Sequence, residues 1–187
     1  MDSAFLSGRL LIAMPGIGDP RFERSLILIC AHDAGHAMGI AVNQPIEGLS
    51  ASELLDRLEI ERAADADAGP VLLGGPVEME RGFVLHTDDY HSEHSLPVVD
   101  GITLTTTREV LVAMAGGDSH PRKAALALGY AGWGAGQLER EIRDNVWLVC
   151  DADEALVFDG DYDTKWTRAL AKLRIDPKFL SAEGGRA

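Results

Sequence analysis

Residues 25–42 read SLILICAHDAGHAMGIAV, which is two apolar runs joined by a short polar segment. The runs 25–31 and 37–42 are rich in residues that favour β-strands. The segment 32–36 between them carries Gly35 near its end. A short linker with a residue able to adopt a positive φ is typical of a β-hairpin. The stretch therefore predicts two neighbouring antiparallel strands.

The rest of the chain continues this pattern of paired strands with a few short helices. The stretches Ser50–Glu53 and Thr106–Glu109 have the sequence of capping boxes, which open helices. We expect further strands at 10–14, 71–73, 82–86, 102–104, 146–150 and 155–158, and further helices at 137–143 and 166–173. Because strands do not alternate strictly with helices, the sequence predicts an α+β fold with a mixed, mostly antiparallel sheet flanked by helices.

Three segments are harder to interpret. Residues 122–128 are apolar and alanine-rich, and fit a helix or a strand equally well. Residues 129–136 read GYAGWGAG, which we interpret as a tight turn that feeds the next helix, although its backbone N–H groups could also hold an anion. Its spacing does not match a dinucleotide or phosphate loop, so we expect no cofactor. The acidic loop 61–69 is the best candidate for local disorder.

The chain is strongly acidic. Its 187 residues include 17 Lys and Arg against 30 Asp and Glu, which gives a formal net charge of −13. This charge repels nucleic-acid backbones and anionic membranes, and the basic residues form no dense cluster. We therefore expect no direct nucleic-acid contact and no membrane contact. No internal repeat or long linker divides the chain, so we expect a single domain over residues 1–187.

Two features favour a cytoplasmic location. The apolar stretch 10–14 is too short to span a bilayer and lacks the flanks of a signal peptide. Cys30 and Cys150 each end an apolar run, which is typical of reduced thiols in a protein core. A disulfide between these two cysteines is the alternative.

Histidines offer candidate metal ligands at two places. His32 and His36 have the spacing of a zinc-protease helix, but a hairpin tip would not bring both imidazoles to one face. His86, His91 and His94 flank an acidic loop, where they are either metal ligands or ordinary surface residues. His86 also ends an apolar strand, so it is either a half-buried structural residue or a pocket residue. We assign no metal to either group.

Short motifs occur along the chain in an order that is more specific than any one of them. They are LIAMP at 11–15, DPRF at 19–22, MGIAVNQP at 38–45, GGPV at 74–77, RGFVLH at 81–86, GYAGW at 129–133, GQLE at 136–139 and NVW at 145–147. Through these motifs the chain resembles the AlgH/YqgE family of small bacterial proteins, over nearly its whole length. The resemblance implies an α+β fold whose bent sheet forms a pseudo-barrel. It implies no defined activity, because the family takes its name from a proposed role in transcriptional regulation of alginate synthesis.

These observations favour a non-enzymatic binding or regulatory protein that acts through a protein or small-molecule partner. Its functional residues would lie at strand ends, where pockets tend to form. The candidate ligand- or partner-binding residues are Asn43, Arg81, His86, Trp133, Gln137 and Glu139, with Pro45, Gly74, Gly75, Pro76 and Tyr130 beside them. The alternative role of the glycines and prolines is turn geometry, and that of Trp133 is core packing. We assign no catalytic residue.

Two other classes of function stay open. One is a hydrolase that uses His86 with Glu139, or a metal held by His91 and His94. General acid–base catalysis needs such groups within hydrogen-bond reach. The other is a DNA-binding transcriptional regulator, as the family name implies, and the net charge argues against it.

Overall fold

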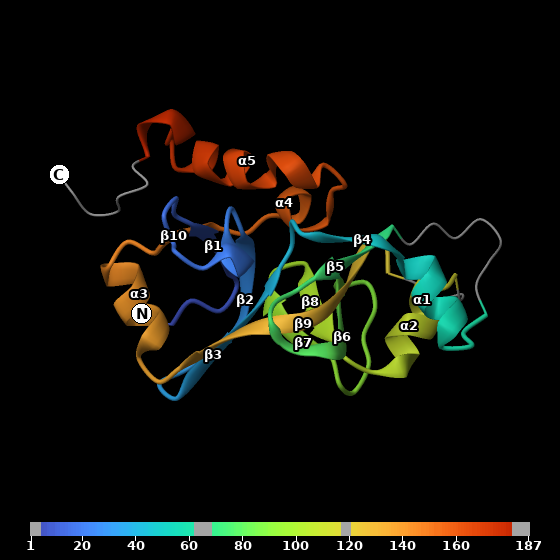
Figure 1. Ribbon diagram of the computed structural model, residues 1–187. Helices are drawn as coiled ribbons and strands as arrows, with labels where there is room; N and C mark the ends of the chain where they lie inside the picture. Colours follow the sequence, from blue (N-terminus) through green and yellow to red (C-terminus); the bar gives the residue numbers. More distant parts are fainter. Residues whose placement is uncertain (1–4, 62–68, 117–120, 181–187) are drawn as a thin grey trace.

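The computed structural model describes residues 5–61, 69–116 and 121–180 (Figure 1). Ten strands form one curled sheet in the order β10-β1-β2-β3-β9-β6-β8-β7, and β5 joins β4 to β9 beside this path. The strands are β1 (Arg9–Ala13), β2 (Leu26–His32), β3 (His36–Ala41), β4 (Pro45–Ser50), β5 (Pro70–Leu73), β6 (Val77–Thr87), β7 (Leu96–Val99), β8 (Ile102–Thr105), β9 (Ala124–Gly134) and β10 (Trp147–Asp151). Neighbours pair antiparallel except β5 and β9, which are parallel. The predicted α+β fold with a mixed, mostly antiparallel pseudo-barrel is therefore confirmed.

Short helices cover the sheet at separate places (Figure 1). The helices are α1 (Ala51–Arg57), α2 (Arg108–Met114), α3 (Gln137–Arg143), α4 (Glu154–Phe158) and α5 (Lys165–Lys172), with 3-10 turns η1 (Pro20–Phe22), η2 (Tyr162–Thr164) and η3 (Pro177–Phe179). The α5 helix packs on β1 and β2, α3 packs on β9 and β10, and α1 packs on β4 and β5. None of the helices in the described part of the chain has the length and apolar character needed to cross a bilayer.

The central strands β1 and β2 are buried on both faces. On one face Leu10 and Leu28 belong to the core that includes Trp166 of α5. On the other face Leu11 and Ile27 belong to the core beneath α3. A strand that is covered on both sides reads as a continuous apolar run rather than an alternating one. This burial explains why the two strands stand out so clearly in the sequence.

The predicted hairpin is formed by β2 and β3, with a shift of register between Ile29 and Ala31. The turn between these two strands is not formed in the way that the sequence predicted, with a residue at positive φ. Asp33 accepts hydrogen bonds through Oδ1 from the backbone N–H groups of Gly35 and His36, at 2.8 and 3.0 Å. Gly35 does not have a positive φ, because this side-chain bridge makes the turn.

The interpretation of 129–136 as a turn was wrong, because most of this segment belongs to β9. Gly129 has a φ of 77°, and a Cβ on it would lie 2.4 Å from the carbonyl oxygen of Gly75. The glycine therefore lets β9 run past the β5–β6 connection and continue to Trp133, which pairs with Ala37 of β3. Residues 124–128, which fit either element, are strand as well.

Other local expectations were also corrected. Residues 155–158 are helix α4 rather than strand, because the Asp153 side chain accepts a hydrogen bond from the backbone N–H of Leu156 and starts a helix. The α2 helix begins after Thr107 rather than Thr106, and the Thr107 side chain makes no capping bond. Strands β4 and β7 were not predicted. Most of the loop expected to be disordered, 62–68, lies outside the described residues.

Candidate functional site

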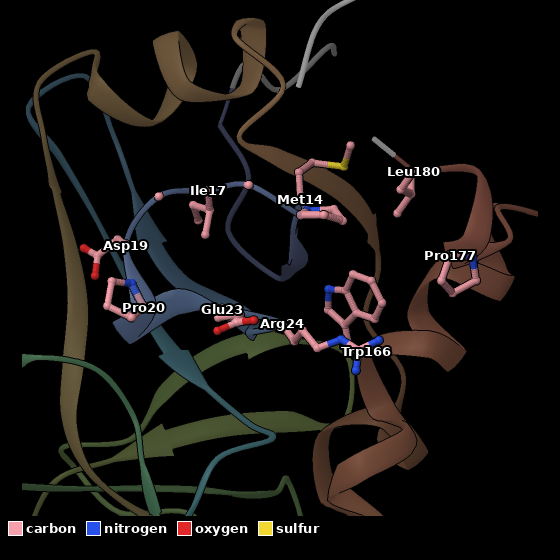
Figure 2. Close-up of a pocket in the computed structure, with 12 residues that line it drawn as sticks. Met14, Ile17, Asp19, Pro20, Glu23, Arg24, Trp166, Pro177 and Leu180 are labelled. Carbon is pink, nitrogen blue, oxygen red and sulfur yellow. The ribbon is translucent and has the colours of Figure 1, made fainter. Parts of the chain in front are cut away.

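A cavity of about 570 Å³ opens between the β1–β2 connection and the C-terminal helices (Figure 2). Its wall includes the apolar residues Met14, Ile17, Trp166 and Leu180. The charged residues at the wall are Asp19, Glu23 and Arg24. Its volume lies within the range of roughly 300–1,000 Å³ that small-molecule sites occupy. This cavity is therefore the candidate functional site.

Two glycines and a capped turn shape the loop along the cavity. Gly16 and Gly18 both have a φ of 81°, a left-handed conformation that glycine adopts without steric cost. Asp19 then caps η1, because its Oδ1 accepts from the backbone N–H of Arg21 at 3.0 Å. The Asp19 carboxylate also pairs with the Arg21 guanidinium at 2.8 Å. The hydrogen bonds from Arg21 lower the pKa of Asp19, so its charge is already balanced within the loop.

Arg24 supplies the positive charge of the cavity. Its φ of 54° is a left-handed conformation that costs a non-glycine residue about 1–2 kcal/mol. Its guanidinium carbon lies 4.6 Å from the centroid of the Trp166 ring. Figure 2 shows the side chain extending from the loop to that ring. Within the described ranges, Arg24 has no carboxylate partner.

Asn43, one of the residues predicted from sequence, holds Arg24 in this conformation. Its Nδ2 donates to the backbone carbonyl of Arg24 at 2.8 Å. Its Oδ1 accepts from the backbone N–H of Leu26 at 2.9 Å. Asn43 therefore fastens the chain on both sides of Ser25. It does not line the cavity itself, so it affects the site by positioning Arg24.

The opposite wall is fixed from α5. The Trp166 indole N–H donates to the carbonyl of Ala13 at 2.9 Å. The neighbouring Lys165 is fully buried, and its Nζ donates to the carbonyls of Val42 and Val157, both at 3.1 Å. The same Nζ lies 4.8 Å from the centroid of the Tyr162 ring. Burial lowers the pKa of Lys165 to about 8.

Because Lys165 is buried, we expect the free energy of unfolding to rise with pH. The folded-state pKa of about 8 lies below the ordinary value of 10.5, so between them the unfolded chain binds more protons than the folded one. We expect a gain of about 1 kcal/mol in the free energy of unfolding between about pH 7.5 and about pH 9. Urea denaturation of the wild type and of Lys165→Met measures it. Both proteins contain the buried thiols, whose titration acts in the opposite direction, so subtracting one free energy of unfolding from the other cancels that effect. If this difference does not change with pH, the prediction is wrong.

Two of the predicted residues, Trp133 and Gln137, lie together at α3, and both donate a hydrogen bond to Glu141. Glu141 accepts through Oε1 from the indole N–H groups of Trp133 and Trp147, at 3.1 and 2.9 Å. Its Oε2 accepts from Nε2 of Gln137 at 2.8 Å, and Oε1 of Gln137 accepts from the backbone N–H of Gly134 at 2.9 Å. Trp133 and Gln137 thus fasten α3 to the ends of β9 and β10. Their observed contacts are those of packing and helix attachment.

The hydrolase hypothesis required Glu139 to pair with His86, but the structure does not pair them. Oε1 of Glu139 lies 2.5 Å from Nε2 of His32, which was considered from the sequence only as a possible zinc ligand at a hairpin tip. The backbone N–H of Leu6 donates to Nδ1 of His32 at 2.9 Å. Because Nδ1 is an acceptor, the Nε2 atom carries the proton and donates it to Glu139. Both ring nitrogens of His32 are therefore engaged.

His86 is a fully buried residue of β6 rather than a cavity residue. Its Nδ1 lies 2.7 Å from the carbonyl oxygen of Thr87, and its Nε2 lies 2.7 Å from Oγ1 of Thr105. Burial lowers the pKa of His86, which favours the neutral ring. Its placement is that of a structural histidine with both nitrogens satisfied.

The remaining predicted residues lie apart from the cavity. The Arg81 guanidinium lies 3.6 Å from Glu78 and 5.1 Å from the ring centroid of Phe83. His91 and His94 follow β6 in the loop before β7. Among the residues that the structure describes, no group of three or more His, Cys, Asp or Glu side chains is arranged to hold a metal. Cys30 and Cys150 are free and buried, and burial raises the pKa of their thiols to about 12 and about 11.

Sequence reasoning missed the two side chains that define the cavity. Arg24 was counted only as a scattered basic residue. Neither the arginine nor the residues beside it in the sequence indicate its positive φ. Trp166 was expected to pack on the core as part of the helix at 166–173, and it does belong to the core, at 5% exposure. Two motifs could have pointed to this region. DPRF at 19–22 lies just before Arg24 in the sequence. NQP at 43–45 is the part of the next motif that begins with Asn43, which contacts the Arg24 backbone.

Comparison with known proteins gives consistent matches along the chain. A family model described as AlgH-like matches residues 10–178. A UPF0301 protein of Caulobacter vibrioides is 63% identical over 187 residues, covering 100% of this chain and 96% of that protein. The solution structure of the AlgH protein from Pseudomonas aeruginosa has a TM-score of 0.79 at 36% identity, covering 100% of this chain and 98% of that one. A crystal structure of a Corynebacterium diphtheriae protein shares the fold, with a TM-score of 0.73 at 18% identity over 94% of this chain and 92% of that one.

Proposed function

The chain belongs to the AlgH-like family, and from this premise we propose that it is a non-enzymatic binding protein whose ligand occupies the cavity beside Arg24 and Trp166. The observation that carries the proposal is the state of Arg24. Its backbone is strained, Asn43 holds that strain in place, and its guanidinium lies over the Trp166 ring at a cavity whose wall is mostly apolar. Strained residues persist only where the surrounding structure maintains them, and they cluster at ligand sites.

The charges at the cavity select the class of ligand. The planar guanidinium of Arg24 suits a carboxylate, to which it can donate two parallel hydrogen bonds. Glu23 lies at the same cavity, and Asp19 is already paired with Arg21. Among the described residues that line the cavity, Arg24 is the one cation, and one cation in a chain of charge −13 disfavours nucleotides and other polyanions. We infer a monocarboxylate with an apolar body that packs against Trp166.

The other two function classes receive less support. The histidines His32 and His86 have both ring nitrogens engaged, so neither is free to take a proton from a substrate, and we do not propose a hydrolase. A role in transcription would operate through the bound ligand or a protein partner, since the net charge disfavours direct contact with DNA. We also propose a cytoplasmic location, which the two free, buried thiols support.

The binding of small carboxylates tests the proposal. Hexanoate and benzoate are titrated into ¹⁵N-labelled protein, with hexanol and benzamide as neutral analogues. We expect the carboxylates to shift the indole N–H resonance of Trp166 saturably, and this resonance is identified by its loss in Trp166→Phe. Arg24→Gln is expected to weaken binding about tenfold or more, because a hydrogen bond to a charged group contributes roughly 1.5–3 kcal/mol.

Arg174 offers a matched control for Arg24. It is an exposed arginine that also has a positive φ, 58°, but it does not line the cavity, so Arg174→Gln is expected to leave binding unchanged. Arg24→Gly is expected to abolish binding with little change in stability. The glycine relieves strain of about 1–2 kcal/mol, and the lost cation–π contact contributes about 0.5–1 kcal/mol. Equal binding by Arg24→Gln and wild type, or no preference for carboxylates over neutral analogues, would overturn the proposal.

A further inference from the structure

A second cavity adjoins the first at η1. Its volume is about 250 Å³, and Pro20 lines both cavities. Its apolar lining includes Phe22, Pro76 and Met79. This volume is below the roughly 300 Å³ at which small-molecule sites begin, so the second cavity fits a single side chain better than a whole ligand.

The polar groups of the second cavity are already satisfied. Nε2 of Gln44 donates to Oγ of the fully buried Ser25 at 2.5 Å. Its one arginine, Arg21, is paired with Asp19 at 2.8 Å. The second cavity therefore selects an apolar group, whereas the first cavity has the guanidinium of Arg24, which pairs with no carboxylate in the described part of the chain.

Two large apolar side chains stand exposed beside these cavities. Met79, which lines the second cavity, is 54% exposed. Phe179 is 79% exposed, and in the sequence it lies between Pro177 and Leu180, which both line the first cavity. Phe, Met and Arg are enriched at protein–protein interfaces relative to the rest of the surface. A small carboxylate held on Arg24 would leave both of these side chains uncovered.

We propose that the two cavities form one docking surface for an extended segment of a partner protein. The segment places an Asp or Glu carboxylate on Arg24 and an apolar side chain in the second cavity, and it covers Met79 and Phe179. Its single acidic residue complements Arg24, because Arg21, the other arginine among the described residues that line the two cavities, is paired with Asp19. The inference rests on the proposed function, because it uses the same anchor, Arg24.

A peptide array tests the inference directly. The probes are acetylated, amidated peptides with one Asp between two Leu residues, with one to four Ala or Gly residues on each side of the Asp. We expect binding at one or two spacings, and we expect replacement of the Asp by Asn to weaken it at least tenfold. Met79→Ser and Phe179→Ser are each expected to weaken binding about fivefold, as removal of an apolar contact at an interface does.

The controls use exposed apolar residues elsewhere on the protein. Leu96 and Val112 are 45% and 49% exposed, and Leu96→Ser and Val112→Ser are expected to leave peptide binding unchanged. If the peptides bind but Met79→Ser and Phe179→Ser have no effect, the surface does not extend beyond the first cavity and the inference is wrong. If hexanoate and benzoate bind but no peptide does, the inference fails while the proposed function stands. If neither class of probe binds, both are overturned.

Discussion

Gly75→Ala is expected to destabilise the protein by about 3 kcal/mol or more, at the upper end of what overpacking costs. A Cβ on Gly75 would lie 2.1 Å from the carbonyl carbon of Tyr130, 2.3 Å from its oxygen and 2.4 Å from the nitrogen of Ala131. All three atoms are backbone atoms of β9, which is paired with β3 and β6 at this level. Because a paired backbone cannot move aside as a side chain can, the clash must displace the β5–β6 connection.

Urea denaturation followed by circular dichroism measures this effect, and the yield of folded protein reports it if the variant does not fold. Gly160→Ala is the matched control, since a Cβ there has nothing within 4 Å and the residue has no positive φ. We expect Gly160→Ala to be as stable as the wild type. A Gly75→Ala protein within about 1 kcal/mol of the wild type would show that Gly75 serves only turn geometry, which was the alternative read from the sequence.

Glu141→Ala is expected to destabilise the protein by about 3 kcal/mol, because it leaves two buried indole donors without an acceptor. The indoles of Trp133 and Trp147 are 5% and 2% exposed, so water cannot readily replace the carboxylate. Gln137 loses one of its two partners as well, which weakens the attachment of the first turn of α3. Unfolding in urea, monitored by tryptophan fluorescence, measures the change.

Glu141→Gln separates the loss of acceptors from the loss of charge. The Gln oxygen can still accept from both indoles, but its NH2 group would face Nε2 of Gln137, so we expect a loss of only about 1 kcal/mol. If Glu141→Ala and Glu141→Gln are equally stable, the indole hydrogen bonds do not hold α3 in place. The motif residues Trp133 and Gln137 would then need another explanation than the one their contacts give.

The elements that were predicted correctly are those whose signal is local and strong. The β2–β3 hairpin and β1 were visible because both faces of these strands are buried, which makes their apolar runs continuous. The α3 helix follows from the spacing of Leu138 and Ile142. The α4 segment was mistaken for a strand because a short apolar run has no distinguishing period, and the deciding Asp153 cap is a single side chain.

The candidate site was harder to predict than the fold. Glu139 and Asn43 were predicted to bind a ligand or partner, and the contacts that the structure shows for them are within the protein. His32 and Glu139 are separated by 107 positions, and Asn43 acts on the backbone of Arg24 rather than on a ligand. His86 was selected for its position at a strand end, and that strand end is buried.

The sequence by itself determined the family, the α+β class, the central hairpin and the acidity that disfavours nucleic acid, because each depends on composition or on residues close together in the chain. Only the tertiary structure decided which side chains meet. The curling of the sheet brings Arg24 of the β1–β2 connection against Trp166 of α5, and it brings the β5–β6 connection onto β9. Such contacts arise from strand pairing and core packing across long separations, which no local pattern encodes, and these contacts create the cavity on which the proposed function depends.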